Sequence, residues 1–409
     1  MKWCTKCVYP ASSAVKLSFD EQSVCSGCIV NGEKPNIDWA KRAQMIKDLV
    51  EPYRSKTGGY DILIPVSGGK DSTYQVWYAT EVLKLKPLLV TYHANNYLPI
   101  GEYNLYRLRH LFNADHIVGG ASIPVLKKLN RLTFKLMGDM SWHCHSGIFS
   151  FPVQMAVKFK VPLIMWGEHG RLDRGGQYSL NDLVEMSARD FHEHHQRGFQ
   201  WKDLTDEGLK KLGYSQYGEG LTEHDFNFFK YPSMEEIAEV GIRGIYLGNY
   251  VNWDPNKQAE FVMKELGWKP SPEPFERTYR TISNLDDMHE TGIKDYLKYV
   301  KFGYGRCSDH ICKDIRLGAM TREEGIELVK KYDHVRSKDF QRWFDYAGMS
   351  EEEFDKICDE RFYDPKIWWK DEFNKWVKEN IWDDKDTLAQ KRVEHKEWLK
   401  KNNINAELA

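Results

Sequence analysis

Ser67-Gly68-Gly69-Lys70-Asp71-Ser72 is the stretch of this sequence that decides the fold. It follows a short apolar run at 60–66, of the kind that forms a buried parallel strand, and it precedes 73–79, which contains no helix breaker. Two adjacent glycines let backbone amides approach an anion without interference from a Cβ atom. The positive end of the following helix points to the same place. The stretch therefore predicts a phosphate-binding loop between a strand and a helix.

The side chains of this loop suit a nucleotide together with a magnesium ion. Ser67 and Ser72 offer hydroxyl groups, and Lys70 adds a positive charge for phosphate. Asp71 cannot hold phosphate directly, so we expect it to bind Mg²⁺, directly or through water. We therefore expect Lys70, Asp71 and Ser72 to act in catalysis. The loop is not a Walker A loop, because an aspartate stands where that motif requires Ser or Thr after its Gly-Lys pair.

Strands and helices alternate along the chain on both sides of the loop. Further apolar runs predict strands at 87–92, 116–118, 161–166 and 244–247. Helical spacing of apolar residues predicts helices at 37–50, 103–111 and 149–159. This alternation predicts an α/β fold, with a mostly parallel sheet covered by helices on both faces. The ligand crevice is then expected at the carboxyl ends of the strands.

Composition and charge argue against some classes of protein. The chain has 58 Lys and Arg against 60 Asp and Glu, which leaves no overall electrostatic footprint for nucleic acid, so we expect no nucleic-acid partner. No apolar run reaches about 18 residues, so no membrane span is expected. The N-terminus lacks the apolar stretch and cleavage site of a signal peptide. We therefore expect a cytoplasmic protein without membrane contact.

Four of the eight cysteines form two pairs, Cys4-Thr5-Lys6-Cys7 and Cys25-Ser26-Gly27-Cys28. Disulfides are rare in the cytoplasm, and two such knuckles complete the tetrahedron of sulfur ligands that a closed structural Zn²⁺ site needs. Gly27 is expected to ease the turn of the second knuckle. Unligated thiols, a labile disulfide or an iron–sulfur cluster remain alternatives. With all four positions filled by protein, we expect a structural role.

The loop sequence Ser-Gly-Gly-x-Asp-Ser, placed directly after a first strand, resembles the PP-loop of the N-type ATP pyrophosphatases. Those enzymes adenylate a carbonyl or carboxyl oxygen, release pyrophosphate, and let a nitrogen or sulfur nucleophile expel AMP. The resemblance implies ATP and Mg²⁺ as cofactors. It also implies nucleotide contacts at Val66, Tyr92, Gly167 and Glu168. Related enzymes carry an acidic pair near the last of these positions, and only Glu168 could replace it here.

Longer segments narrow the resemblance. Residues 248–255, 301–310 and 314–318, together with the cysteine knuckles, are similar to the N-acetyl sugar amidotransferases. That family implies conversion of a sugar N-acetyl group, often on a UDP-linked diacetamido sugar, into an acetamidino group for lipopolysaccharide O-antigen or flagellin glycans. It also implies ammonia from a separate glutaminase with a cyclase-like subunit, and this sequence shows no evident glutaminase nucleophile of its own.

The resemblance suggests three regions. Residues 1–50 form a four-cysteine zinc-knuckle module, 51–270 form the PP-loop ATP pyrophosphatase domain, and 271–409 form a helical region for substrate or partners, with its tryptophans in a core. Over 171–240 the alternation of strands and helices is lost. We interpret that segment as an insertion near the active-site face, with a role as a lid.

Six residues are candidates for substrate binding: Cys144, His169, Arg171, Arg174, Arg306 and His310. A cationic segment beside a glycine-rich turn contains Arg306, His310, Lys313 and Arg316. Such a segment suits a substrate phosphate or carboxylate, and ordinary helix-surface salt bridges are the alternative.

Several residues have competing interpretations. Cys144 could suggest a tRNA thiolase, but such an enzyme would need a second cysteine where Gly147 stands. We therefore expect Cys144 either to line the substrate site or to be structural. The histidines at 192, 194 and 195 are expected to be a solvated or lid segment and not a metal site. Cys307, Cys312 and Cys358 have no assigned role. A tRNA thiolase and an ATP-binding scaffold remain the alternative functions.

Overall fold

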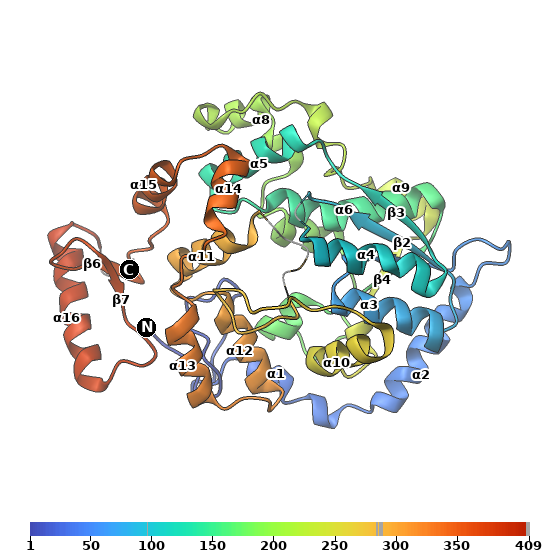
Figure 1. Cartoon of the computed structure of the whole chain (residues 1–409), viewed down its shortest axis with the longest axis horizontal. Helices are drawn as coiled ribbons and strands as arrows, with labels where there is room; N and C mark the ends of the chain where they lie inside the picture. Colours follow the sequence, from blue (N-terminus) through green and yellow to red (C-terminus); the bar gives the residue numbers. More distant parts are fainter. Residues whose placement is uncertain (96, 284, 286–288, 406–409) are drawn as a thin grey trace.

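The computed structural model describes residues 1–95, 97–283, 285 and 289–405. Five strands form one parallel sheet, in the order β3-β2-β1-β4-β5 (Figure 1). They are β1 (Ile62–Pro65), β2 (Pro87–Tyr92), β3 (Asp115–Gly119), β4 (Leu163–Trp166) and β5 (Arg243–Tyr246). Each strand lies where an apolar run predicted it, so the α/β fold with its parallel sheet is confirmed.

The first strand, β1, lies at the centre of the sheet. Leu63 is in register with Leu88 of β2 on one side and with Ile164 of β4 on the other. Successive side chains of the strand enter opposite cores, with Ile62 and Ile64 on one face and Leu63 on the other. A strand that is buried on both faces has no polar side to present, which explains why its sequence is a continuous apolar run.

Helices cover both faces of this sheet. The core on the Ile62 face includes residues of α2 (Trp39–Val50), α3 (Lys70–Trp77) and α4 (Pro99–Phe112). The opposite core includes residues of α5 (Ile123–Met137) and α6 (Trp142–Phe159). A further helix, α10 (Pro255–Leu266), packs against α3. The sequence patterns did not predict α5.

The segment 171–240 consists of short helices joined by loops. They are η4 (Arg171–Gly175), α7 (Ala188–Asp190), η5 (Phe191–His195), η6 (Trp201–Leu204), α8 (Asp206–Lys211), η7 (Ser215–Tyr217), η8 (Glu223–Phe226) and α9 (Met234–Val240). Leu204, Phe226 and Phe229 are fully buried in the same core as α5 and α6. Much of the segment is therefore an integral layer of the domain.

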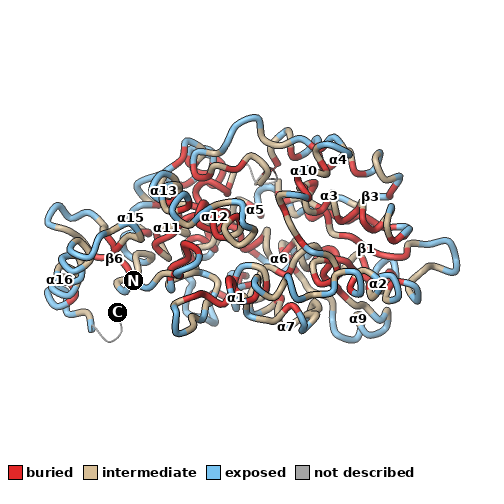
Figure 2. The backbone as a smooth tube through the Cα atoms, turned by 90° about the horizontal axis from the view of Figure 1, so that it is seen from below, coloured by how far each residue is buried: buried red, intermediate tan, exposed pale blue. Residues whose placement is uncertain are grey.

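The C-terminal region is mainly helical. Its helices are α11 (Thr291–Phe302), α12 (Arg306–Arg316), α13 (Arg322–Tyr332), α14 (Phe340–Ala347), α15 (Glu351–Arg361) and α16 (Lys385–Lys401). These helices lie beside the sheet, and α16 lies farthest from it (Figures 1 and 2). Within α16 only Leu399 is buried, in agreement with its pale colour in Figure 2.

A two-stranded antiparallel hairpin interrupts these helices, where the sequence analysis expected only helical packing of tryptophans. It consists of β6 (Trp368–Lys370) and β7 (Trp376–Lys378). The turn forms because Asp371 accepts backbone hydrogen bonds from Phe373 and Lys375 through one carboxylate oxygen. Asn374 takes a left-handed conformation there, with φ of 59°, which asparagine tolerates better than most residues.

The N-terminal cysteine module packs against the C-terminal region. Its four cysteines share one apolar core with Cys307, Ile311 and Cys312 of α12 and with Val329 of α13. The second knuckle opens α1 (Ser26–Asn31). The cysteine module therefore adjoins α12, the helix that also carries Arg306 and His310.

Across the described ranges of the chain, we find no helix with both the length and the apolar character that a bilayer crossing requires.

Candidate active site

The phosphate loop connects the carboxyl end of β1 to the first turn of α3. Gly68 has a φ of 74°, and a Cβ atom there would lie 2.6 Å from the backbone of Leu105 in α4. The Gly68 carbonyl accepts a hydrogen bond of 2.9 Å from the indole nitrogen of Trp268. The Ser72 hydroxyl donates to the Gly69 carbonyl at 3.1 Å and closes the turn. Only glycine fits at position 68, because both the conformation and the close approach exclude a side chain.

Lys70 and Asp71 form an ion pair at the start of α3. The distance from Lys70 Nζ to Asp71 Oδ2 is 2.6 Å, and the lysine is almost fully buried. The other carboxylate oxygen, Asp71 Oδ1, is buried and accepts no hydrogen bond from any residue that the structure describes. A buried carboxylate oxygen without a partner is costly, and a divalent cation is a suitable partner for it. Asp71 therefore fits the predicted role in Mg²⁺ binding.

A second acidic group lies at the end of β4. Lys313 of α12 reaches across to Glu168, with Nζ 2.8 Å from Oε2, and to Asp173 of η4, at 3.1 Å. Burial raises the pKa of Glu168, and the nearby carboxylates of Asp173 and Asp71 raise it further. Asp71, Glu168 and Asp173 therefore lie within electrostatic reach of one another, and Lys313 offsets part of their charge.

Asp173 is the acidic residue that the sequence analysis missed. It lies in the segment interpreted as an insertion, five residues after Glu168 in the chain. Burial opposes its ionisation, but Lys313 and Lys34 keep the pKa of Asp173 below its ordinary value, so it is a carboxylate at neutral pH. The related enzymes' acidic pair could have prompted a search for a second carboxylate downstream of Glu168.

Helix α12 lies near enough to the phosphate loop for the charge of Lys70 to act on His310. Burial, together with the positive charges of Arg306, Arg280 and Lys70, holds the pKa of His310 well below its ordinary value. His310 is therefore a neutral imidazole, and its Nδ1 lies 2.7 Å from the Thr278 hydroxyl. One turn earlier, the Arg306 side chain is 30% exposed, pairs with Asp309 at 3.4 Å, and has a buried Nε without a partner among the described residues.

The other predicted contacts with the nucleotide lie at the same edge of the sheet but differ in accessibility. The Val66 carbonyl accepts a hydrogen bond of 2.5 Å from Thr91, and Gly167 lies against Gln75 and Trp253. Tyr92 is buried, and its hydroxyl lies 3.4 Å from His143 Nδ1 within the core. The Tyr92 side chain is therefore directed into the protein.

The predicted substrate residues near β4 differ in how strongly they are held within the protein. His169 is buried, and burial lowers its pKa to about 4. Arg171 pairs with Asp190 and hydrogen-bonds the Tyr178 hydroxyl at 2.9 Å. Arg174 is exposed. Cys144, near the start of α6, is half-buried.

The side chains of the histidine segment are held by neighbouring residues. His195 stacks on Phe149, with ring centroids 3.6 Å apart, and pairs with Asp190 at 3.4 Å. His194 contacts the guanidinium of Arg171. Over the part of the chain that the structure describes, the four N-terminal cysteines are the one group of three or more His, Cys, Asp or Glu residues that could hold a metal ion.

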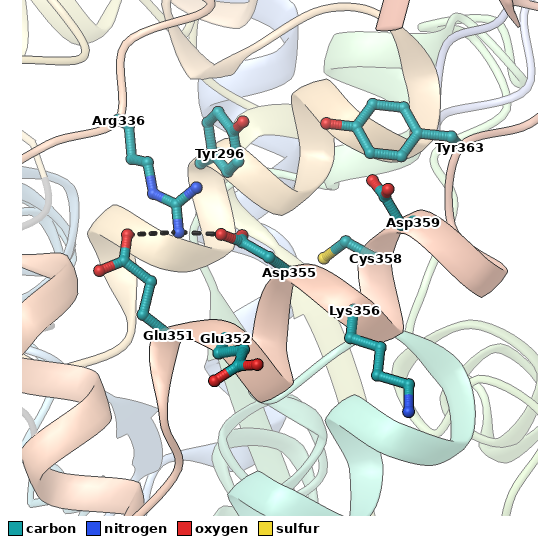
Figure 3. Close-up of a pocket in the computed structure, with 9 residues that line it drawn as sticks. All are labelled: Tyr296, Arg336, Glu351, Glu352, Asp355, Lys356, Cys358, Asp359 and Tyr363. Carbon is teal, nitrogen blue, oxygen red and sulfur yellow. Dashed lines mark ion pairs between the residues drawn. The ribbon is translucent and has the colours of Figure 1, made fainter. Parts of the chain in front are cut away.

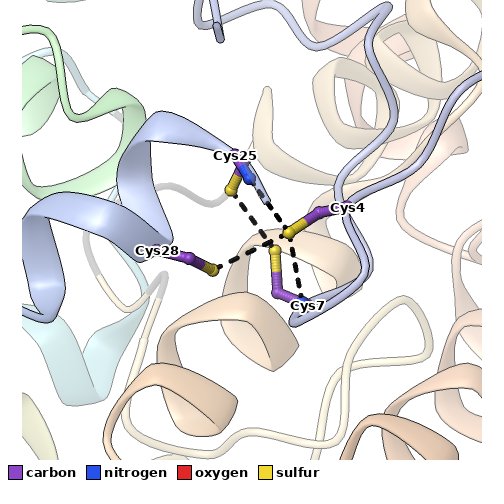
Figure 4. Close-up of side chains that lie close together, drawn as sticks. All are labelled: Cys4, Cys7, Cys25 and Cys28. Carbon is purple, nitrogen blue, oxygen red and sulfur yellow. Dashed lines mark hydrogen bonds between the residues drawn. The ribbon is translucent and has the colours of Figure 1, made fainter. Parts of the chain in front are cut away.

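The side chains of the four cysteines point toward one another (Figure 4). All four sulfurs are buried and lie within 4.8 Å of one another, with Cys7 and Cys25 at 3.7 Å and Cys4 and Cys28 at 4.0 Å. A tetrahedral ion with Zn–S bonds of about 2.3 Å requires sulfurs about 3.8 Å apart. The spacing fits one ion and is too long for a disulfide. A cluster of several irons would hold sulfurs that bind different irons farther apart than this.

A separate surface cavity of about 820 Å³ lies on the C-terminal region (Figure 3). Its lining includes Glu351, Glu352, Asp355 and Asp359 against two cations, Arg336 and Lys356. Arg336 is already paired with Glu351 at 2.8 Å and Asp355 at 2.9 Å. An acidic wall repels a polyphosphate, so this cavity is a poor site for ATP.

Comparisons with known proteins agree with parts of this description. Residues 274–383 match the family described as "LPS biosynthesis protein WbpG-like, C-terminal domain", and this segment contains α12. No curated protein sequence matches the chain.

Two solved structures share a low overall similarity with the chain. An NH3-dependent NAD synthetase from Campylobacter jejuni is 14% identical over 55% of this chain and 96% of its own, with a TM-score of 0.27. An NMN synthetase from Francisella tularensis is 10% identical over 58% of this chain and 99% of its own, with a TM-score of 0.23. Scores this low do not bear on function, and the fold assignment depends on the strand pairing described above.

Proposed function

We propose that this chain is an ATP-dependent sugar amidotransferase, which converts an N-acetyl group of a sugar into an acetamidino group. The observation that carries the proposal is the ion pair between Lys313 of α12, a helix of the WbpG-like segment, and Glu168, which follows β4. The loop supplies the chemistry of an adenylating enzyme. The WbpG-like segment favours a substrate from lipopolysaccharide biosynthesis.

The reaction that we propose has two steps. The amide oxygen of the N-acetyl group attacks the α-phosphorus of ATP, and the bond to pyrophosphate breaks. Ammonia then adds to the activated carbon, AMP leaves with the former amide oxygen, and a proton is lost to give the amidine. The first step is needed because an amide oxygen is a poor leaving group, whereas AMP is a good one.

The residues of the loop would hold the part of ATP that leaves. Backbone amides at 67–72 and the Ser67 and Ser72 hydroxyls would bind the β- and γ-phosphates, and Lys70 would neutralise their charge. Asp71 would bind Mg²⁺, directly or through water, and the nearby carboxylates of Glu168 and Asp173 would add negative charge that favours the ion. When bound, Mg²⁺ would offset the negative charge on the phosphates. Fixed donors of this kind lower the barrier because they need no rearrangement during the reaction.

The sugar would bind between α12 and the segment that follows β4. Arg306, with its partly exposed side chain and unpartnered Nε, suits the diphosphate of a sugar nucleotide or the carboxylate of an uronic acid. His310 as a neutral imidazole can accept or donate a hydrogen bond there. Cys144, His169, Arg171 and Arg174 are the further candidates for this surface.

Ammonia is proposed to come from a separate glutaminase with a cyclase-like subunit, since the chain carries no glutaminase motif. The proposed reaction belongs in the cytoplasm, where ATP is available and where reduced thiolates can hold zinc.

A direct assay tests this proposal. The protein is incubated with ATP, Mg²⁺, ammonium chloride and a UDP-linked diacetamido sugar. We expect AMP and pyrophosphate, together with a sugar in which NH has replaced one oxygen, detected by mass spectrometry. Release of ADP, or AMP release only with tRNA and a sulfur donor, would contradict the proposal, and the second outcome would favour a thiolase.

A further inference from the structure

Helix α12 joins the cysteine cluster to the acidic group of the candidate active site. Lys313 contacts the carboxylates of Glu168 and Asp173, and Arg316, one turn later, contacts the backbone of η4. Arg316 donates to two cysteine sulfurs, with Nε 3.5 Å from Cys28 Sγ and Nη2 3.5 Å from Cys25 Sγ. Its Nη1 donates to the Asp173 carbonyl at 2.9 Å and to the Arg174 carbonyl at 3.1 Å.

The contact between the second cysteine knuckle and η4 is too close to admit other side chains. A Cβ atom at Gly27 would lie 2.2 Å from Arg316 Nη2 and 2.5 Å from the Arg174 carbonyl oxygen. The Ser26 hydroxyl donates to the Gly175 carbonyl at 2.5 Å. The sequence analysis attributed Gly27 to the turn of the knuckle, but the close approach of Arg316 and η4 is what excludes a side chain there.

A guanidinium group is suited to this position because its five N–H donors lie in one plane with fixed directions. Two of its nitrogens, Nε and Nη2, donate to sulfur, and the third, Nη1, donates to the backbone of η4. Metal-bound thiolates carry negative charge and accept hydrogen bonds more strongly than thiols do. The position of the Asp173 backbone therefore depends on Arg316, and Arg316 depends on the cysteine sulfurs.

We propose that Arg316 is a positioning residue, which uses the metal-holding cysteine cluster to fix Asp173, and with it the Asp173–Lys313 contact, beside the phosphate loop. The effect on nucleotide binding rests on the proposed function, whereas the effect on η4 does not. The four-cysteine cluster then has a role in the reaction in addition to stabilising the fold.

The chain offers a matched control for this proposal. Arg322 of α13 also contacts the cysteine module, with Nε 3.1 Å from the Cys7 carbonyl oxygen. Among the described residues, its hydrogen bonds go to the carbonyls of Cys4 and Cys7 and not to η4. Arg322→Gln therefore perturbs the same module without removing the link to Asp173.

The experiment compares the full-length chain with Arg316→Gln, Arg316→Lys and Arg322→Gln. Zinc content, the Kd of the Mg²⁺ complex of a non-hydrolysable ATP analogue, and amide hydrogen exchange are measured for each. In Arg316→Gln we expect zinc to be retained, faster exchange at 171–176, and a Kd about tenfold higher, the size of one lost charge-assisted hydrogen bond. Arg316→Lys keeps the charge but not the planar donors, so we expect an intermediate result. Arg322→Gln should leave exchange at 171–176 and the Kd unchanged.

Two results would overturn the inference. One is Arg316→Gln with zinc bound and with unchanged exchange at 171–176. The other is an equal change in Arg322→Gln, which would indicate general loosening of the module. If the unsubstituted protein binds no ATP analogue, the proposed function fails, but the exchange data still decide whether Arg316 positions η4.

Discussion

The phosphate loop and the cysteine cluster begin from equally short motifs, but they are completed in different ways. The loop at 67–72 takes most of its shape from its own glycines and hydroxyls, with Leu105 and Trp268 limiting the space around it. The cysteine cluster needs two knuckles and an arginine that is 288 residues away from Cys28. The loop, as a local motif, should lose its structure when its backbone conformation is changed. The cysteine cluster, as an assembled site, should lose its structure when any contributing residue is removed.

The largest effect is expected from breaking the assembled site. Cys25→Ser removes one of four sulfur ligands, and structural zinc contributes about 10–16 kcal/mol in isolated zinc-finger peptides. We expect loss of zinc and destabilisation by about 5 kcal/mol or more, measured by metal analysis and denaturant unfolding. Cys307→Ser is the control, because Cys307 is buried in the same core without belonging to the cluster. A stable, zinc-free Cys25→Ser protein would show that the cluster is not a structural metal site.

The next largest effect should be on catalysis at the local site. Asp71→Asn keeps the shape of the side chain but removes the charge that we assign to Mg²⁺ binding. We expect AMP formation to fall by about a hundredfold or more, as for other lost electrostatic contacts in active sites, with an unchanged melting temperature. Asp48→Asn, on an exposed part of α2, should have full activity. Full activity in Asp71→Asn would remove the basis for its metal role.

The third largest effect should come from replacing a glycine in the phosphate loop, because its backbone conformation excludes a side chain. Gly68→Ala combines a left-handed φ with a clash against Leu105, and we expect a loss of about 2–4 kcal/mol in unfolding free energy, together with loss of ATP binding. Gly58→Ala provides the matched control, since Gly58 has a φ of 84° but open space around its Cβ position. It should cost only about 1 kcal/mol. Equal losses in the two variants would show that the close approach is unimportant.

The smallest effect should be a pH dependence of stability and of Mg²⁺ binding that arises from Glu168. The folded-state pKa of Glu168 is raised from its ordinary value of 4.5, so the folded protein binds this proton more tightly than the unfolded chain does. The free energy of unfolding therefore falls as pH rises through the raised pKa, because Glu168 ionises less readily in the folded protein. Below pH 4.5 this destabilisation is absent. Mg²⁺ binding should follow the opposite trend and weaken as pH falls.

Calorimetric titration of Mg²⁺ into the ATP-bound protein across that pH range measures this trend. Glu168→Gln should bind Mg²⁺ more weakly than the unsubstituted protein at neutral pH, and its affinity should vary less with pH. An identical pH profile in both proteins would mean that Glu168 does not contribute to the metal site.

The parts of this protein that were predictable from the sequence are those determined by neighbours in the chain. A buried parallel strand must be apolar throughout, so 60–66, 87–92 and 161–166 were evident. A glycine pair between a strand and a helix predicts an anion loop, and two cysteine knuckles predict a cluster of four sulfurs that could hold a metal ion. Each of these patterns carries its physical reason within a few residues.

Tertiary structure decided which distant residues complete those motifs. Asp173 is unremarkable in a charged stretch of sequence, and it becomes part of the site because Lys313 lies 3.1 Å away on a helix from another region. The hairpin at 368–378 and the link from Arg316 to Cys28 were also not predictable from the sequence. Helical and strand periodicities describe only contacts along one element, whereas these pairings depend on how α12 packs between the sheet and the cysteine module.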